Sequence, residues 1–254
     1  MTGLWDPQSY QTFDDHRARP FRELVARVSA SRPRRVVDLG CGPGTRTVEL
    51  AARWPGAVLE ALDSSPDMVT DARARGVNAH LVDVRDWSPA ADADVVICNA
   101  VLQWVPEHAD LLPGWLTALP PGAWFAMQVP GNFAAPSHLL VRELVAEQPW
   151  AQRVQPLRED VVLDPAGYAE LMTAAGCRTD AWETTYLQRM EGEDPVLRWI
   201  SGTALRPIRA ALPDAEWNRF CAQLAPRLRE AYPASPDGST WFPCRRVFAV
   251  AQRP

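Results

Sequence analysis

Three glycines with alternating spacing, Gly40, Gly42 and Gly44, follow directly after an apolar run that ends at Leu39. Glycine allows the backbone to turn sharply and to approach a ligand without a Cβ in the way. The helix expected after the loop offers free N–H groups to an anion. A dinucleotide-binding loop would place its third glycine at position 45, where this chain has Thr45. The loop therefore predicts a nucleotide-like ligand that is not held by a pyrophosphate.

Two acids follow at the spacing of consecutive strand ends. Asp63 stands nineteen residues after Gly44, and Asp83 stands twenty residues further on, beside Val84. A carboxylate at the end of the second strand can accept two hydrogen bonds from a ribose diol. A second acid at the end of the third strand can bond an adenine amino group. Taken singly, each acid could equally cap a helix or a turn; together with the loop, the pair predicts a nucleoside that carries an amino-acid tail.

An alternation of strands and helices must position these groups. Short apolar runs separated by helical patterns and turn residues predict an α/β fold with a parallel sheet. The expected strands are 35–39, 58–62, 78–82, 93–98, 123–129, 178–189 and 245–251. The expected helices are 45–53, 66–75, 107–119, 138–147, 165–175, 195–212 and 214–231, and residues 149–162 are expected to form a surface loop.

The late helices interrupt the last pair of strands, which suggests a division of the chain. We expect an N-terminal lid or helix at 1–32, a ligand-binding core at 33–190, a helical cap at 191–243 and a closing strand of the core at 244–254. Open α/β sheets bind their ligands at the carboxyl ends of the strands. The cap is therefore expected to cover that edge.

Composition narrows the possible partners and the location. The chain has 254 residues and a net charge of −5, which disfavours nucleic acid as a partner. No stretch has the ~20 apolar residues of a membrane helix, and the first residues lack a signal-peptide pattern, so we expect a cytoplasmic protein that does not act at a membrane. The five cysteines show no metal-ligand spacing, so free thiols and no metal are expected. All 26 basic residues are arginine, so an anion site must use arginine, histidine, hydroxyls or backbone N–H groups. The sequence leaves the oligomeric state open.

Longer segments resemble a known family. Asp38-Leu-Gly-Cys-Gly-Pro-Gly44 resembles motif I of class I S-adenosylmethionine-dependent methyltransferases. Nearly the whole chain is similar to the trans-aconitate 2-methyltransferase family, on the segments Trp5–Tyr10, Arg19-Pro20, Leu62–Met68, Asn99–Trp104 and Thr203–Pro207. The resemblance implies a Rossmann-like class I sheet, mostly parallel with an antiparallel last strand, and a helical cap.

The resemblance also implies how S-adenosylmethionine would be held. Asp38 would bond its amino group, and the three glycines of the loop would line its methionine end. Asp63 would hold the ribose, with Ser64 and Met68 nearby. The remaining contacts, to adenine and to the meeting point of cofactor and substrate, are assigned to Asp83, Val84, Asn99, Gln103 and Trp104. The N-terminal piece around Trp5, Tyr10 and Arg17 would fold over as a lid.

The family implies methyl transfer to a carboxylate, which gives a monomethyl ester. A carboxylate with a pKa near 4 is already ionised at neutral pH, so no general base is expected and no catalytic residue is named. Arginine pairs bidentately with carboxylates, and the candidates in order are Arg206, Arg209 and the pair Arg245 and Arg246. Further hydrogen bonds or shape could come from His108, Gln128, Tyr186 and Trp199.

Other interpretations stay open at this point. The arginines could be ordinary surface charges, and Trp104 and Trp199 could be core residues. The chain could methylate another small molecule, such as a phenol or an amine, in which case a hydrophobic pocket without convergent arginines is expected. It could also bind S-adenosylmethionine without turnover. A nicotinamide dehydrogenase is disfavoured by Thr45 and by the absence of lysine, which such enzymes pair with a catalytic tyrosine.

Overall fold

The computed structural model describes residues 14–157 and 162–254. The chain divides into two compact units, and each is described by itself. The larger unit comprises Asp15–Pro130, Val161–Thr184 and Arg246–Pro254. The smaller unit includes Thr185–Arg245 and the segment that begins at Gly131. The division into lid, core and cap that the sequence predicts stays a prediction.

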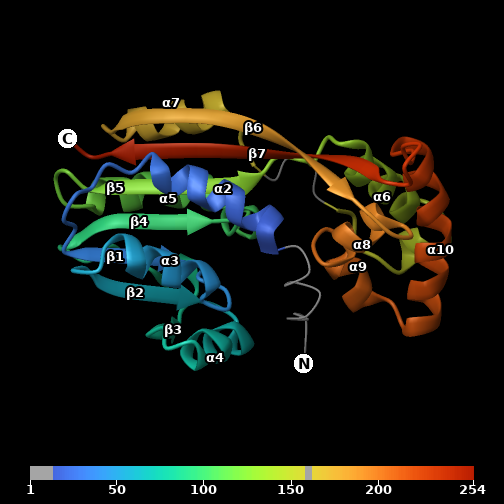
Figure 1. Ribbon diagram of the computed structural model, residues 1–254, viewed down its shortest axis with the longest axis horizontal. Helices are drawn as coiled ribbons and strands as arrows, with labels where there is room; N and C mark the ends of the chain where they lie inside the picture. Colours follow the sequence, from blue (N-terminus) through green and yellow to red (C-terminus); the bar gives the residue numbers. More distant parts are fainter. Residues whose placement is uncertain (1–13, 158–161) are drawn as a thin grey trace. The chain divides into compact units, whose positions relative to one another are not determined.

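One seven-stranded sheet carries the larger unit, in the order β3-β2-β1-β4-β5-β7-β6. Strands β1 to β5 are parallel, and β7 runs antiparallel to β5, as the opposite direction of its arrow shows in Figure 1. The predicted fold class is thereby confirmed. The strands are β1 (Arg35–Leu39), β2 (Val58–Asp63), β3 (Ala79–Leu81), β4 (Ala93–Asn99), β5 (Trp124–Pro130), β6 (Arg178–Met190) and β7 (Thr240–Gln252).

Helices of the larger unit cover the two faces of this sheet. They are α2 (Asp14–Ala26), α3 (Thr45–Arg53), α4 (Pro66–Ala74), α5 (His108–Ala118) and α7 (Pro165–Ala174), with the 3-10 turns η1 (Val84–Asp86) and η2 (Leu102–Trp104). Local signals explain their limits. In α4, Ser65 accepts a bond from the amide of Met68 as the N-cap, and Pro66 occupies the first turn.

Alternation along the strands separates two sets of side chains. Val37, Val96, Phe125 and Ala251 lie in register on neighbouring strands and belong to one buried apolar cluster, which also contains residues of α5 and α7. Successive side chains on a strand point to opposite faces. The intervening residues, Asp38 among them, therefore face the other side, where Thr47 of α3 bonds Asp38.

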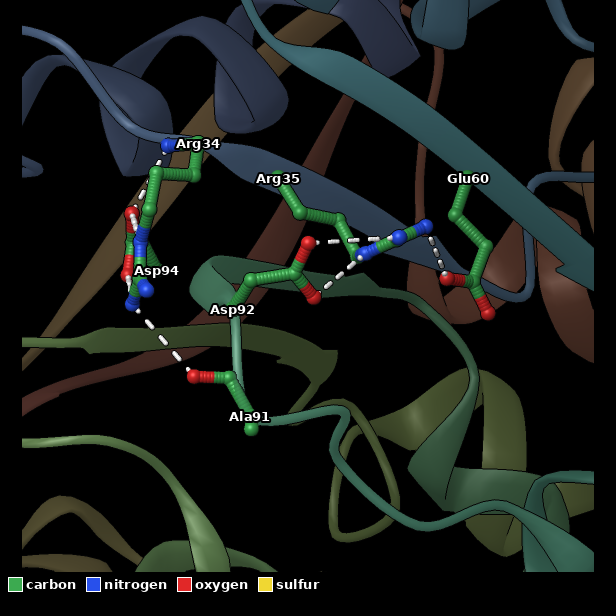
Figure 2. A network of polar contacts seen from close by, with 6 residues as sticks. All are labelled: Arg34, Arg35, Glu60, Ala91, Asp92 and Asp94. Carbon is green, nitrogen blue, oxygen red and sulfur yellow. Dashed lines mark hydrogen bonds and ion pairs between the residues drawn. The ribbon is translucent and has the colours of Figure 1, made fainter.

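The amino edge of the sheet carries a network of ion pairs, shown in Figure 2. Arg34 pairs with Asp94, and it also donates to the carbonyl of Ala91. Arg35 bonds Asp92 through Nε at 2.8 Å and Glu60 through Nη1 at 3.1 Å. Ion pairs at this edge therefore join β1 to β2 and to the start of β4.

The smaller unit contains α6 (Pro136–Ala146), η3 (Trp150–Gln152), α8 (Pro195–Ser201), α9 (Arg206–Ala211) and α10 (Asp214–Ala231). Trp150 is fully buried and donates to Gln223 of α10 at 2.8 Å. The expectation of a surface loop over 149–162 is therefore wrong for Trp150; residues 158–161 lie outside the described residues.

Two other sequence predictions need correction. The single helix expected at 195–212 is two helices, α8 and α9. Proline lacks an amide hydrogen and clashes with the carbonyl four residues earlier, so Pro207 takes an early position in α9 and the helix is broken after Ser201. The closing strand β7 is also longer than the 245–251 expected, because it begins at Thr240.

None of the helices that the structure describes combines the length and the apolar character needed to cross a membrane. All five cysteines are free, and four of them are buried. The described residues contain no group of three or more His, Cys, Asp or Glu side chains arranged to hold a metal ion.

Candidate active site

The glycine loop connects β1 to α3, and its three glycines have positive φ angles of +83° (Gly40), +55° (Gly42) and +79° (Gly44). A Cβ on Gly40 would lie 2.1 Å from Cγ2 of Val101, and one on Gly44 would lie 3.0 Å from Cβ of Ala72. A Cβ on Gly42 would meet nothing within 4 Å. Two of the glycines are thus required by packing, whereas Gly42 borders open space into which a ligand could fit.

Asp63, at the end of β2, is hydrogen-bonded to this loop. Its carboxylate accepts hydrogen bonds from the amide of Gly42 at 2.8 Å and from the amide of Ser65 at 2.9 Å. Burial raises the pKa of Asp63 above its ordinary value, although these amides act in the opposite direction. Asp63, which is predicted to bind the ribose, therefore also fixes the position of the glycine loop.

Asp38 lies on β1, directly before the loop, and is only 3% exposed. Thr47 donates to its carboxylate at 2.6 Å. Burial, with a smaller contribution from the charge of Asp63, raises the pKa of Asp38 to about 6. A buried carboxylate without a full positive partner is costly, so this position is suited to a ligand that brings an ammonium group.

Asp83 follows β3 and begins η1, where it accepts a hydrogen bond from the amide of Arg85 at 2.9 Å. Arg85 also forms ion pairs with Asp83 and Glu107. Asp83 is therefore a cap, as the alternative interpretation of the sequence held, and its predicted contact with adenine stays a prediction. The other residues assigned to this region differ in exposure: Val84 and Met68 are buried, and Ser64 is exposed.

At the carboxyl end of β4, one residue has an unusual backbone conformation, and two side-chain amides each have an oxygen without a hydrogen-bond partner among the described residues. Ala100 has a φ of +58°, a conformation that strains a residue with a Cβ. Asn99 Oδ1 and Gln103 Oε1 are buried without a hydrogen-bond partner in the described chain. Gln103 donates through Nε2 to the carbonyl of Ala100 at 2.6 Å. Trp104 is 46% exposed, so it is not a core residue.

Two further buried polar atoms of the larger unit lie near the same edge. Gln128 Nε2 on β5 and Arg246 Nε on β7 have no hydrogen-bond partner among the described residues. Buried polar groups are nearly always bonded, so each exception calls for an explanation.

His108 lies elsewhere in the larger unit. It is buried at the start of α5, with Nδ1 at 2.8 Å from the carbonyl of Val105 and Nε2 at 2.8 Å from the hydroxyl of Tyr168 on α7. Tyr168 belongs to the apolar cluster on the opposite face from Asp38. Both ring nitrogens serve the protein core, and the predicted substrate role of His108 has no support from its position.

The remaining substrate candidates lie in the smaller unit. Arg209 of α9 donates to the carbonyl of Leu212 at 3.0 Å and forms an ion pair with Asp214. Arg245 donates to the carbonyl of Gly131. Arg206 begins α9, and burial lowers its pKa. Tyr186 and Trp199 are buried, and the Trp199 ring lies 6.2 Å from that of Phe242.

Of the proposed lid, Trp5 and Tyr10 lie outside the described residues, as does the side chain of Arg17.

Two residues important for the site were not identified from the sequence. Thr47 bonds Asp38, and Ala100 has a left-handed backbone. A hydroxyl in the first turn of the helix after the glycine loop was a weak signal for Thr47. The sequence carried no signal for Ala100, because alanine rarely adopts a positive φ.

Comparisons with known proteins agree with this geometry. Residues 13–208 match the model of a family described as "Methyltransferase domain". The YcgJ protein from Bacillus subtilis has a similar fold, with a TM-score of 0.60 at 12% identity over 93% of this chain and 98% of that one. The fold and the glycine loop thus define a methyltransferase domain.

Relatives narrow the class further. The trans-aconitate 2-methyltransferase of Rhodococcus jostii (strain RHA1) is 61% identical over 252 residues, which cover 98% of this chain and 99% of the relative. That of Mycolicibacterium gilvum (strain PYR-GCK) is 58% identical with the same coverage. The chain belongs to the trans-aconitate 2-methyltransferase family.

Proposed function

We propose that this chain transfers a methyl group from S-adenosylmethionine to one carboxylate of trans-aconitate. The observation that carries the proposal is a glycine loop open over Gly42, flanked by the buried carboxylate of Asp38 and the partly buried carboxylate of Asp63, in a chain 61% identical to a trans-aconitate 2-methyltransferase along nearly its whole length. The family predicted from the sequence is the one to which the chain belongs.

The residues at the carboxyl edge fit S-adenosylmethionine. Gly42 offers space, Asp38 offers a buried carboxylate for the ammonium group, and Asp63 offers acceptor oxygens for a ribose diol. Asn99 Oδ1 and Gln103 Oε1 are acceptors that need a donor. Gly40 and Gly44 shape the loop, while Ser64, Met68, Asp83, Val84 and Trp104 form its surroundings in the proposed assignment.

The chemistry asks little of the protein beyond position and environment. When bound, S-adenosylmethionine supplies a sulfonium methyl group, to which a carboxylate oxygen forms a bond as the carbon–sulfur bond breaks and its electron pair passes to sulfur. The carboxylate is ionised at neutral pH, so no side chain has to remove a proton. Alignment of the two reactants can supply roughly 7–11 kcal/mol. The chain's contribution is to orient the acceptor and to exclude water from the attacking oxygen.

A polyacid acceptor needs positive charge at the site, because the chain has a net charge of −5. Within the larger unit the proposed contacts come from Arg246 and Gln128, while the smaller unit's candidates, Arg206, Arg209, Arg245, Tyr186 and Trp199, stay predictions from the sequence. Arg209 is the weakest of these, since its guanidinium already forms an ion pair with Asp214 and a bond to Leu212.

Incubation of the protein with S-adenosylmethionine and a panel of di- and tricarboxylates tests the proposal. Mass spectrometry should find a monomethyl ester and S-adenosylhomocysteine, with trans-aconitate the best acceptor by kcat/KM. Phenols and amines serve as the competing acceptors. Turnover of a phenol or amine but of no polyacid would refute the acceptor class, and binding of S-adenosylmethionine without turnover of any acceptor would refute the enzymatic role.

The setting of this activity is also part of the proposal. Free cysteines throughout the chain agree with a reducing compartment, and we place the protein in the cytoplasm, with a small carboxylate rather than nucleic acid or membrane as its partner. Net negative charge supports this choice, because nucleic acid and anionic lipid attract basic surfaces.

A further inference from the structure

Several polar side chains of the larger unit project from one face of the sheet. Asp38 on β1 is in register with Ile97 on β4, and Asn99 lies two residues further along the same strand. Asn99 is in register with Gln128 on β5. Since residues two apart on a strand, and residues paired across strands, share a face, Asp38, Asn99 and Gln128 point to the same side.

Strand β7 extends this row. Pro130 of β5 is paired with Arg246, and Gln128 is paired with Phe248. Arg246 is therefore the diagonal neighbour of Gln128 on the same face. Cβ atoms in such diagonal positions are about 7–8 Å apart, within reach of two long side chains that converge on one ligand.

Gln128 and Arg246 are both buried, and each has one N–H donor without a hydrogen-bond partner in the described part of the chain. Gln128 is 2% exposed and Arg246 is 9% exposed. The atoms without a partner are the amide nitrogen Nε2 of Gln128 and the guanidinium nitrogen Nε of Arg246. Two N–H donors in diagonal positions on paired strands, one of them charged, can both bond one carboxylate. A single carboxylate would satisfy both.

The surroundings strengthen such a contact. Phe248, directly opposite Gln128, is fully buried and stacks on Trp182 with ring centroids 4.8 Å apart and planes 3° from parallel. The amide of Ala100 donates to the carbonyl of Gln128 at 2.8 Å, which ties the ends of β4 and β5 together. An apolar floor and a fixed backbone favour a charge-assisted hydrogen bond over a loose surface contact.

We infer that Gln128 and Arg246 together bind one carboxylate of the acceptor, and that this carboxylate is not the one that is methylated. The inference rests on the proposed function and adds a subsite to it. Donors that hold both oxygens of a carboxylate withdraw electron density from them, so the held group is a poor nucleophile. The carboxylate that attacks the methyl group is then a different one, closer to Asn99 and the glycine loop.

The spacing of the strands agrees with this division. Asn99 and Arg246 stand on β4 and β7, which are separated by β5 alone. Two strand spacings amount to about 10 Å. A short polyacid can therefore have one carboxylate at the β5–β7 pair while another lies beside the cofactor residues of β1 and β4.

Calorimetric titration of trans-aconitate into the protein saturated with S-adenosylhomocysteine tests the subsite. Arg246→Gln should weaken trans-aconitate binding at least tenfold, and Arg246→Lys should fall between this variant and wild type because it keeps the charge but loses the fork. The affinity for S-adenosylhomocysteine should stay within twofold of wild type. Arg32→Gln is the matched control, because Arg32 is exposed and its loss changes the net charge equally.

The position of the ester gives a second readout that a merely structural role would not change. Wild type should yield one regioisomer by NMR, whereas Arg246→Gln should yield a mixture, since the acceptor can then bind in more than one orientation. If Arg246→Gln fails to fold, as judged by loss of S-adenosylhomocysteine binding, Gln128→Leu replaces it with the same expected results.

Two outcomes separate this inference from the proposed function. Wild-type turnover of trans-aconitate, with unchanged acceptor affinity and unchanged regiochemistry in the variants, would overturn the subsite alone. Absence of any polyacid ester from the wild-type protein would overturn the proposed function as well.

Discussion

The two edges of the sheet in the larger unit differ in how their polar groups are satisfied. At the amino edge, Arg34 and Arg35 find carboxylate partners on β2 and around the start of β4. At the carboxyl edge, buried amide and guanidinium atoms of Asn99, Gln128 and Arg246 lack hydrogen-bond partners among the residues that the structure describes, and Asp38 is a buried acid. The same strands carry both edges. The difference is that ion pairs within the protein join the amino edge, whereas three polar side chains, each with a buried atom that has no partner in the described chain, lie together at the carboxyl edge.

The largest expected effect separates two glycines of one loop. Gly40→Ala should reduce the free energy of unfolding by about 3 kcal/mol, because its Cβ would lie 2.1 Å from Val101 and its φ is +83°. Gly42→Ala should cost only about 1 kcal/mol, from its positive φ alone, and should instead weaken S-adenosylmethionine binding. Urea unfolding and calorimetry measure the two quantities. Wild-type affinity for S-adenosylmethionine in Gly42→Ala would contradict the assignment of Gly42 to the ligand, and equal loss of stability in both variants would contradict the difference in their packing.

Removal of the Asp63 carboxylate should act on the cofactor. Asp63→Ala is expected to weaken S-adenosylmethionine binding more than tenfold, since the proposed ribose contact and the hydrogen bond to the Gly42 amide are lost together. Asp94→Ala, at the amino edge, is the matched control and should leave this affinity unchanged. Wild-type affinity in Asp63→Ala would remove the basis for the ribose assignment.

The buried acid at the carboxyl edge should make the protein less stable than it could be. Burial raises the pKa of Asp38 from 3.8 to about 6, so the folded protein holds this proton more tightly than the unfolded chain. Stability from this group is full below about pH 4, is lost as the pH rises through 6 and stays lost above it. Asp38→Asn should therefore raise the free energy of unfolding at pH 8 by about 1–3 kcal/mol, with no gain at pH 4.

The same titration should appear in ligand binding. If Asp38 binds the ammonium group as its carboxylate, the affinity of the wild-type protein for S-adenosylmethionine should decline as the pH falls below about 6. Asp38→Asn should bind weakly at every pH and show no such decline. A wild-type affinity that is flat between pH 5 and 8 would disprove this role.

The smallest effect is expected at the amino edge. Asp94→Ala breaks the ion pair with Arg34, whose side chain is largely exposed, so Tm should fall by at most a few degrees. High salt should remove the part of the difference that comes from the exposed Arg34 guanidinium, because exposed charges are screened, whereas the loss of the Asp94 bond to the Arg34 amide remains. A large loss of stability that persists in high salt would mean that the Arg34–Asp94 contact is more than an exposed ion pair.

Local patterns sufficed for the sheet and for the glycine loop. The apolar runs before Gly40 and Asp63, and the cap and proline before Met68, are short-range signals, and the structure follows them closely. The start of α9 also agrees with a local signal, because proline is favoured in the first turn of a helix and Pro207 occupies that place in α9.

The row from Asp38 to Arg246 could not be predicted in the same way. It depends on the register between β4, β5 and β7, and Gln128 and Arg246 lie more than a hundred residues apart in the sequence. The sequence favours Arg206 and Arg209 over Arg246, because resemblance and charge can be recognised in a sequence whereas burial cannot. The ion pair of Arg209 with Asp214 became visible only in three dimensions.

The alternation along β5 has a consequence for how acceptor preference can evolve. Met127 and Val129 pack in the apolar cluster, whereas Gln128 between them is on the face of the sheet that carries Asp38 and Asn99. A point substitution at position 128 can change specificity while the hydrophobic contacts of its neighbours are kept. Insertion or deletion of one residue in β5 would exchange the two sets of side chains. Divergence of this enzyme towards new acids should therefore proceed by replacement of alternate residues, with strand length held constant.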